Sequence, residues 1–481
     1  MSSSLPVRRR TAARLLVAVV VLGLFAPAAT QAIAPGDTGT PGTVGLEAGT
    51  IASEANGSTV VAIQGFHFQG QGSQKKPARL VSVAPNGSTE WVYDGDNQNA
   101  RWFYDVDPLP NGNLLVVGTN ADGTTVAELD PETREPVWTE RLDMHDTHDV
   151  DMLPNGNLVI ANMRNWNEEE QISDDRVVVY NRTTDEIVWE WMFRKHYPNS
   201  TDGGFDEDWT HVNDVDRIAE GQYLVSPRNF DQAIVINRST KEIDYRLGSD
   251  GNHEILDEQH NPDWLVSEDG DPTVLVADSE NDRVVEYERD DGEWTKTWQV
   301  GVSLGGEGAE TSKLNWPRDA DRLPNGNTLI TDSLNHRVIE VTPRGEIVWE
   351  YYATWGPYEA ERVAHGDGSN GPTMADQGVT GSYRVHGSAG LIEGTGDSLT
   401  FAAGVQNTFA GTPIAGPATA FADTWAGVTP WIRPVWMGSW AFAGAVAGLL
   451  VLFGWGVAET VASRRAIRRG MRRAADEVRT R

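Results

Sequence analysis

A sequence frame that occurs four times limits the folds open to this chain more than any other feature. The frame is D-x-D, then an aliphatic residue, a turn with glycine and a further apolar strand, and its copies begin at Asp105, Asp149, Asp214 and Asp319. In three copies the turn reads L-P-N-G-N, and an Asn-Gly step supplies the positive φ that a tight hairpin needs. With a degenerate copy at Asp263, the spacings run from roughly 44 to 65 residues. Strand clusters at this period indicate a β-propeller with one sheet per blade.

Short segments that carry a tryptophan or tyrosine and end each unit give the number of blades. Each follows an apolar strand and reads like the outer strand of a blade. Six of them occur, at residues 89–92, 136–138, 186–189, 242–245, 293–295 and 346–349. We therefore predict an all-β, six-bladed propeller over residues 50–393. Its first inner strand is expected at 58–64, and a strand near 382–385 is expected to close the ring.

The charge balance excludes one class of partner. The chain carries 39 Lys and Arg against 70 Asp and Glu, a formal net charge of −31. A field of that sign repels phosphate backbones, so no nucleic-acid partner is expected. Such a surface is typical of halophilic proteins, because the Debye length falls to about 3 Å in molar salt. We predict that the protein loses structure on desalting. The chain has no cysteine, which excludes disulfides and thiolate chemistry.

Two apolar segments flank the acidic body and predict its attachment to a membrane. Three arginines precede an apolar run over residues 15–29, as in an export signal or an uncleaved anchor. Residues 437–458 carry no charge and are long enough to span a bilayer. Arginines follow this run, so the positive-inside rule places the C-terminus in the cytoplasm and the propeller outside the cell. The predicted protein is a single-pass or double-pass protein of the cell membrane that contacts lipid through its C-terminal helix. Its predicted parts are a signal peptide or N-terminal anchor (1–34), a linker (35–49), the propeller (50–393), a Gly/Ala/Thr-rich appendage or stalk (394–434), a transmembrane helix (435–460) and a basic cytoplasmic tail (461–481).

The residues just before each D-x-D step differ between copies and are the candidates for function. Three residues before the first Asp stand Trp102, Asp146, His211, His260 and Trp316, and one residue before it stand Tyr104, His148, Asn213, Pro262 and Arg318. Positions two apart share one face of an extended strand, so these side chains are expected to converge in the central channel. A pocket with several histidines and arginines is suited to chemistry on an anion.

Two segments with a D-S-x-N-x-R pattern leave the role of their arginines open. Residues 278–283 and 332–337 are similar to a step of NHL-type propellers in which, the resemblance implies, the Asp and Arg hold a blade together. Arg283 is therefore either structural or substrate-binding, whereas His336 and Arg337 are interpreted as structural or solvated. No close spacing of histidines supports a metal site, and neither a metal nor a cofactor is predicted.

One stretch of the chain resembles a known enzyme family. Residues 208–215 (D-W-T-H-V-N-D-V) and 226–229 (S-P-R-N) resemble the D-W-x-H-x-N-S-V and S-x-R segments of the arylsulfate sulfotransferases. Residues 259–262, the L-P-N-G-N turns and residues 382–385 are similar as well, so the likeness covers about residues 50–390. The resemblance implies a six-bladed propeller that moves a sulfuryl group from an aryl sulfate to a phenol. It also implies a sulfated histidine as intermediate and no nucleotide cofactor.

The resemblance implies roles for individual residues. His211 and His260 match histidines that contact and stabilise the sulfuryl group. A guanidinium from Arg283 or Arg228 would pair with the sulfate oxygens in a bidentate manner. The predicted substrate-binding residues are Arg228, Arg283, Asn213 and Arg318.

The nucleophile is the point at which this chain departs from the family pattern. The family takes its nucleophilic histidine from a later blade, whereas residues 315–318 read N-W-P-R in this chain. Either His148 has taken over that role, because its offset points inward, or loops bring His336 or His386 into the channel, or the protein does not catalyse the reaction. His148 is the first of these candidates, and the predicted catalytic set is His211, His260 and His148.

Two functions follow from these observations. The first is a membrane-anchored extracellular arylsulfotransferase-like enzyme acting on small aryl sulfates and phenols. The alternative is a non-catalytic propeller that binds an anionic ligand or a cell-surface partner, which the missing nucleophile favours. A quinoprotein or lactonase is disfavoured, since neither metal-ligand spacing nor a quinone-docking repeat is recognisable. The sequence does not predict the donor, the acceptor or the oligomeric state.

Overall fold

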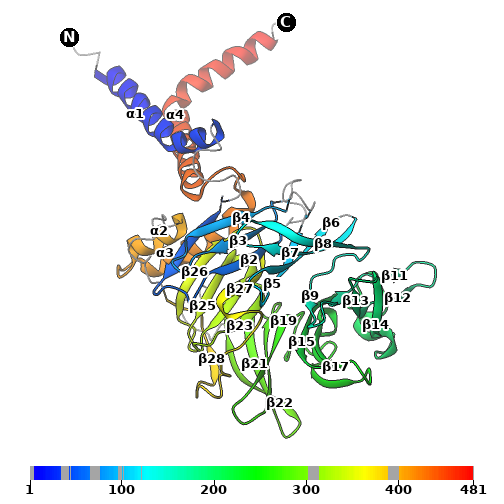
Figure 1. The fold of residues 1–481 in the computed structure, drawn as a ribbon. Coiled ribbons are helices and arrows are strands. Elements are labelled where there is room, and N and C mark those ends of the chain that lie inside the picture. Colours follow the sequence, from blue (N-terminus) through cyan, green and yellow to red (C-terminus); the bar gives the residue numbers. More distant parts are fainter. Residues whose placement is uncertain are drawn as a thin grey trace. The chain divides into compact units, whose positions relative to one another are not determined.

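The chain forms two compact units in this computed structural model (Figure 1). One unit spans Gly45–Ile432 and contains the described strands, and the other combines Met1–Val44 with Arg433–Arg481. The structure describes residues 5–33, 43, 45–65, 76–95, 100, 102–120, 122–301, 314–387 and 400–479. Most of the predicted linker, residues 35–49, lies outside these ranges.

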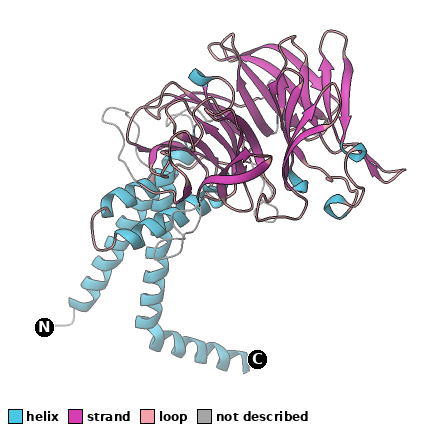
Figure 2. Ribbon diagram, turned by 90° about the horizontal axis from the view of Figure 1, so that it is seen from below, coloured by secondary structure: helices cyan, strands magenta, loops and turns pink. Residues whose placement is uncertain are grey.

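Six sheets of four or five strands make up the propeller in the part of the chain that the structure describes, which confirms the predicted fold class (Figure 2). In sheet order they are β27 (Pro357–Arg362), β2 (Thr59–Ile63), β3 (Arg79–Val83) and β4 (Thr89–Tyr93); β5 (Trp102–Pro108), β6 (Leu114–Asn120), β7 (Gly123–Asp130) and β8 (Glu135–Leu142); β9 (Val150–Met152), β10 (Leu158–Asn162), β13 (Arg176–Asn181) and β14 (Glu186–Met192); β15 (Val212–Ala219), β16 (Gln222–Pro227), β17 (Gln232–Asn237) and β18 (Ile243–Gly248); β19 (His260–Val266), β20 (Pro272–Asp278), β21 (Arg283–Asp290), β22 (Glu293–Val300) and β28 (Gly381–Tyr383); β23 (Pro317–Arg322), β24 (Thr328–Asp332), β25 (Arg337–Val341), β26 (Ile347–Ala353) and β1 (Leu46–Ile51). A short hairpin of β11 (Trp166–Asn167) and β12 (Ile172–Ser173) interrupts the third sheet.

The ring closes differently from the prediction. The innermost strand of the first sheet is β27, which pairs antiparallel with β2. Residues 58–64, expected to be innermost, therefore contain the second strand. Residues 382–385, expected to close the ring, overlap β28, which lies parallel to β22 at the outer edge of the fifth sheet. At the outer edge of the sixth sheet β1 adds a strand, where Leu46 pairs with Ala353. The sequence frame missed β27 because that strand carries Glu359-Ala360-Glu361 in place of D-x-D.

Apolar clusters between neighbouring blades form the core. The middle strands are buried on both faces, as in β10, where residues 158–161 are all buried. Such strands read as continuous apolar runs, because no face has to meet water. One cluster joins Val177 of the third sheet to Val215 and Val225 of the fourth. The blades are therefore held together face to face by aliphatic packing.

The D-x-D step connects neighbouring blades at the inner strands. Asp105 Oδ2 accepts a hydrogen bond of 3.0 Å from Val150 N in the next blade. Glu359 Oε2 accepts one of 2.9 Å from Val106 N and so joins the last inner strand to the second sheet. In these blades the first acid of the step therefore has a structural role, because it binds the backbone of the neighbouring blade. Glu359, which replaces the Asp in β27, has the same role.

A fully buried ion pair lies inside the propeller and yields a stability prediction. Arg322 Nη1 lies 3.0 Å from Glu286 Oε2 with both side chains 0% exposed. Losing one partner leaves a buried charge uncompensated, so we expect Arg322→Met to lower the free energy of unfolding by about 3–5 kcal/mol. The double variant R322M/E286L should recover most of that loss, since an apolar pair of similar volume removes both charges. Chemical denaturation at high salt measures both values, and strictly additive losses would contradict the prediction.

Helices α2 (Phe401–Phe409) and α3 (Ala415–Ile432) belong to the propeller unit and fall within the predicted appendage, residues 394–434. Trp355 Nε1 donates a hydrogen bond of 2.9 Å to Pro430 O. The ring of Trp431 lies 4.5 Å from that of His336, measured between centroids. Helix α3 therefore packs on the propeller.

The terminal unit consists of α1 (Leu5–Ile33) and α4 (Ser439–Arg479). Their segments Thr11–Ile33 and Ser439–Val461 are long and apolar enough to cross a membrane, judged by length and composition. Arg14 Nη2 lies 2.9 Å from Glu459 Oε2. At the other end of the pair, Gln31 Oε1 accepts a hydrogen bond of 3.0 Å from Gly438 N. The two helices are thus antiparallel neighbours.

Candidate functional site

Aromatic and imidazole rings gather where the inner strands of the propeller begin. The ring centroid of His148 lies 5.0 Å from that of His211 and 5.4 Å from that of Tyr358. The Tyr358 ring lies 5.8 Å from the ring of His260. The three predicted catalytic histidines, each from a different blade, are therefore members of one buried cluster. We call it the histidine cluster.

Backbone irregularities accompany these side chains in several inner strands. His211, Asp146 and Trp316 have φ of 38°, 56° and 55°, in the left-handed region that residues other than glycine seldom adopt. Register shifts follow in β5, β15, β19 and β23, for example between Val212 and Val215. Such a bulge re-aims the side chains beside it. The two positions nevertheless place their side chains together, as expected: the rings of Trp102 and Tyr104 are stacked with centroids 6.1 Å apart.

His211 contacts the carboxylate of Asp208, which Arg164 links to a second carboxylate. Its Nδ1 lies 2.8 Å from Asp208 Oδ1, and Arg164 connects Asp208 (3.3 Å) with Asp146 (2.7 Å). Because a carboxylate only accepts, the proton of a neutral His211 lies on Nδ1 and the lone pair on Nε2. Burial, and then the charge of Arg228, lower the pKa of His211 well below its usual value. The imidazole is therefore neutral at neutral pH, with Nε2 available.

His148 lies between two tyrosines. Its ring centroid is 3.9 Å from that of Tyr104, and its Nδ1 is 3.1 Å from the Tyr358 hydroxyl. Its Nε2 faces Asp146 Oδ1 at 3.6 Å, the same oxygen that accepts a hydrogen bond of 2.9 Å from the Tyr104 hydroxyl. Burial lowers the pKa of His148. Both ring nitrogens thus have polar neighbours already.

His260 has one occupied and one unoccupied ring nitrogen. Ser279 Oγ lies 2.8 Å from His260 Nδ1 and donates its own proton to Pro317 O at 2.7 Å. The Nδ1 of His260 is therefore the donor, and its Nε2 carries the lone pair. That Nε2 is buried and has no hydrogen-bond partner among the described residues. Burial, and then the charges of Arg318 and Arg228, lower the pKa of His260 well below its usual value.

Two guanidinium groups supply positive charge to the cluster. Arg318 lies over the ring of Trp316, with its Cζ 3.9 Å from the ring centroid, and its Nη1 donates a hydrogen bond of 2.6 Å to Gln64 Oε1. Burial lowers the pKa of Arg318 to about 10, so the group remains a cation at neutral pH. Arg228 is more exposed, and its Nε lies 3.5 Å from Glu258 Oε2. Both charges act on the histidines.

Arg283, the other predicted anion-binding arginine, is not brought into the cluster. Its Nε donates a hydrogen bond of 2.6 Å to Asp278 Oδ2, and its Nη1 donates one of 3.1 Å to Gln299 Oε1. Its Nη2 donates to two main-chain carbonyls. The guanidinium thus holds its own blade and the segment that enters it, which is the structural role that the sequence left open for it.

The remaining predicted residues have separate positions. Asn213 is fully buried and donates a hydrogen bond of 2.9 Å to Gln259 O, which ties two inner strands. His336 packs on Trp431 of α3. His386 is exposed, and its backbone bridges to Glu346 beside the outer strand β26. His386 therefore does not reach the channel.

Tyr358 is the member of the cluster that the sequence reading missed. It stands one residue before Glu359, the position that holds Tyr104, His148 and Arg318 in other blades. Treating Glu as equivalent to Asp in the repeated frame would have found it. Asp208 also went unassigned, although it lies inside the stretch that resembles the family segment.

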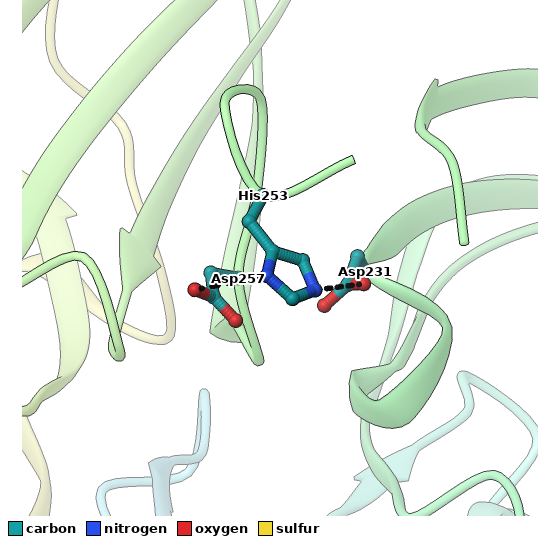
Figure 3. Close-up of side chains that lie close together, drawn as sticks. All are labelled: Asp231, His253 and Asp257. Carbon is teal, nitrogen blue, oxygen red and sulfur yellow. Dashed lines mark ion pairs between the residues drawn. The ribbon is translucent and has the colours of Figure 1, made fainter. Parts of the chain in front are cut away.

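His253 contacts two carboxylates outside the histidine cluster (Figure 3). Its Nε2 lies 3.3 Å from Asp231 Oδ2 and its Nδ1 lies 3.6 Å from Asp257 Oδ2. Asp231 also accepts hydrogen bonds from Gly251 N and Glu258 N, each of 3.0 Å. The group is therefore a loop tie around Asp231 and has no contact with the histidine cluster among the described residues.

The cluster combines the parts that transfer of an anionic group needs. It offers imidazole lone pairs on His211 and His260, and it offers cations in Arg318 and Arg228. Positioned cations and donors stabilise negative charge on a transferring group, and a neutral imidazole serves as nucleophile or proton acceptor. The chemistry favoured by this site is therefore transfer of a negatively charged group.

Comparison with known proteins supports the resemblance read from the sequence. Residues 63–255 match the family model of the arylsulfotransferases (ASST). This range includes His148, His211 and Arg228, whereas His260, Arg318 and Tyr358 lie beyond it. No curated protein sequence matches the chain.

Several solved structures are similar to this chain. A protein of unknown function from Bacteroides caccae has 12% identity and a TM-score of 0.43 over 64% of this chain and 98% of its own. A putative 6-phosphogluconolactonase from Bacteroides fragilis has 13% identity and a TM-score of 0.39 over 63% of this chain and 97% of its own. A catalytically inactive virginiamycin B lyase from Staphylococcus aureus has 10% identity and a TM-score of 0.37 over 64% of this chain and 85% of its own.

Proposed function

We propose that this chain, whose residues 63–255 match the arylsulfotransferase family, transfers a sulfuryl group from an aryl sulfate to a phenol through a histidine intermediate. The observation that carries the proposal is the histidine cluster, with its two lone pairs and two guanidinium groups. Bulk acidity repels a sulfate ester, so local cations are required for such a substrate to bind. Arg318 and Arg228 meet that requirement.

The first half-reaction uses His211 as the nucleophile. Its Nε2 lone pair attacks sulfur while the bond between sulfur and the aryl oxygen breaks, and the electron pair of that bond leaves on the phenolate. Asp208 stabilises the cationic imidazole that forms, because its carboxylate lies 2.8 Å from Nδ1. His148 was the first candidate from the sequence, but both its nitrogens face polar neighbours. The geometry therefore favours His211.

His260 is the proton carrier in this scheme. In the first half-reaction the departing phenolate takes a proton from His260 Nε2. In the second, the acceptor phenol returns a proton to Nε2 as its oxygen attacks sulfur and the bond between His211 and sulfur breaks. Two arginines lower the pKa of His260 in the free site. A bound sulfate ester offsets those charges, so protonation of His260 accompanies substrate binding.

A direct assay tests the proposal. The purified protein, kept at high salt, is incubated with 4-nitrophenyl sulfate and a phenol, and release of 4-nitrophenol is followed. We expect release that accelerates with the phenol, and we expect a peptide containing His211 to gain the mass of SO₃ when the acceptor is left out. Saturable binding of the ester without release or adduct would instead support the alternative, a non-catalytic propeller for an anionic ligand.

We also propose that α1 remains in the membrane as a partner of α4, which gives a double-pass protein with the propeller outside the cell. A Cβ at Gly444 would lie 2.8 Å from Leu24 O, and one at Gly448 would lie 2.6 Å from the Phe25 ring. Small residues at this spacing let membrane helices approach closely. The antiparallel pairing puts both arginine-rich flanks on one side, as the positive-inside rule requires. N-terminal sequencing of the mature protein tests this, and a start after residue 34 would contradict it.

A further inference from the structure

The axis of the propeller contains a second polar site, separate from the histidine cluster. It is a cavity of about 210 Å³ that is lined by eleven carboxylates and a single basic side chain, that of Arg217, among the described residues. His148, His211, His260 and Arg318 are not part of its lining. The carboxylates come mainly from the D-x-D steps, because the first and third residues of each step point to the same side of the inner strand.

Three of these carboxylates converge on one point. Asp149, Asp214 and Asp216 each present an oxygen within 4.8 Å of the others. Asp214 and Asp216 are the two acids of the step in β15, and Asp149 comes from the neighbouring blade, directly before β9. Asp214 is 2% exposed and Asp149 is 8% exposed. We call these three residues the aspartate triad.

An independent observation shows oxygens that point into the cavity without a partner. Oδ2 of Asp214 is buried and receives no hydrogen bond from an N–H or hydroxyl group of a described residue, and the same is true of Oδ2 of Asp321, whose side chain is 3% exposed. The carboxyl neighbours of these two groups are Asp149 and Asp263, respectively. The neutral amide oxygen of Asn261, whose side chain also lines the cavity, is likewise buried without a hydrogen-bond donor among the described residues. Buried acceptors are rarely left unpaired in folded proteins. Here three such buried acceptors, each from a different blade, line the same cavity.

We infer that the aspartate triad binds a hard divalent cation, Ca²⁺ in the first instance. The available ligands are all oxygens, which suit Ca²⁺ and Mg²⁺ rather than the softer metals. Ca²⁺ accepts irregular sets of six to eight oxygens, whereas Mg²⁺ demands a near-ideal octahedron. The three carboxylates of the triad and the amide oxygen of Asn261, which lines the same cavity, match the former better, with water completing the set when the ion is bound. This inference does not depend on the proposed transferase activity.

A proton is the competing way to neutralise these groups. Burial, and then the charges of neighbouring carboxylates, raise the pKa of Asp149 and of Asp216 well above the usual value. Burial likewise raises the pKa of Asp214. A bound cation favours the ionised form of the same carboxyl groups, so protons and the cation compete for them.

Terbium luminescence provides the test, because Trp264 lines the cavity and can sensitise a lanthanide bound there. Full-length protein in detergent at high salt is stripped with a chelator, titrated with Tb³⁺ and then back-titrated with Ca²⁺. We expect saturable emission that Ca²⁺ displaces. Asp214→Asn should weaken Tb³⁺ and Ca²⁺ binding at least about tenfold, since a charged ligand is lost. Absence of saturable binding would overturn the inference.

The loop tie around His253 offers a matched control, because Asp231, His253 and Asp257 also place three ligand atoms within 4.8 Å of one another. Asp257→Asn should leave binding unchanged. If Asp257→Asn removes the signal and Asp214→Asn does not, the cation binds outside the channel and the inference fails.

Thermal unfolding separates lost binding from lost folding. Asp214→Asn keeps the shape of the side chain and removes one charge from a repulsive group, so its melting temperature in chelator should equal or exceed that of the wild type. Ca²⁺ should raise the melting temperature of the wild type by a few degrees and that of the variant much less. Equal responses of the two proteins to Ca²⁺ would overturn the assignment to the triad.

Discussion

Replacing His211 by alanine is expected to lower kcat/KM for sulfuryl transfer from 4-nitrophenyl sulfate by at least about a thousandfold, because the variant has lost its nucleophile. The SO₃ adduct should disappear as well. Asp208→Asn should lower kcat by about a hundredfold, since the amide no longer fixes the proton on Nδ1 or stabilises the cationic imidazole. Stopped-flow release of 4-nitrophenol and mass analysis of peptides measure the two effects.

His148→Ala distinguishes this assignment from the one the sequence favoured. If His211 is the nucleophile, His148→Ala should slow formation of the adduct, through loss of its contacts with Tyr104 and Tyr358, and should leave the adduct on His211. An adduct that survives His211→Ala and vanishes with His148→Ala would reverse the roles. His253→Ala is the control, because its side chain is 59% exposed and lies in the separate loop tie.

The pH dependence of adduct formation follows from the same environment. Burial, and then the charge of Arg228, lower the pKa of His211 well below the usual value near 6.5. Only the neutral imidazole of His211 attacks, so on the acid side the rate should decline only below about pH 6, whereas a decline on the alkaline side reports loss of the His260 proton. Arg228→Met removes a cation that lowers the pKa, so the acid limb should move to higher pH. A loss of protein fold alone would not move that limb.

The repeat explains why so much of the fold could be predicted. Glycine turns and apolar strands are local signals, and six outer strands fixed the number of blades before any contact was known. Closure of the ring is not local, because β27 pairs with a strand nearly 300 residues away in sequence, as Thr59 and Arg362 illustrate. The inner strand of that blade has Glu359-Ala360-Glu361 in place of D-x-D, so the repeated frame did not identify it. The pairing of β27 with β2 is therefore known only from the structure.

The site was predictable to the extent that it follows the repeat. The offset from the first Asp selected His148, His211, His260 and Arg318 from different blades, and these side chains do converge. Residues with left-handed φ and the bulges beside them, which the spacing does not predict, also influence the direction of these side chains. Which nitrogen is available depends on partners such as Asp208 and Ser279, and those contacts have no signature in the spacing.

Arg318→Met is expected to lower kcat/KM by about a hundredfold to a thousandfold, in the range found when one preorganised donor to a developing anion is removed. The guanidinium lies against Trp316 and is fixed by Gln64, so it is oriented before the substrate arrives. Methionine keeps most of the packing volume and removes the charge. Arg318→Lys should recover part of the loss, since it restores the charge without the planar fork that pairs with two sulfate oxygens.

Arg283→Met is the matched comparison, because the sequence placed both arginines among the anion-binding candidates. Its guanidinium holds Asp278 and Gln299, so this variant should lower the melting temperature while kcat/KM of the folded fraction changes little. A second readout belongs to Arg318 alone: its charge lowers the pKa of His260, so Arg318→Met should raise that pKa and move the pH profile of phenol release upward. A structural role for Arg318 would reduce stability and leave the profile in place, whereas an unaltered kcat/KM would remove Arg318 from substrate binding.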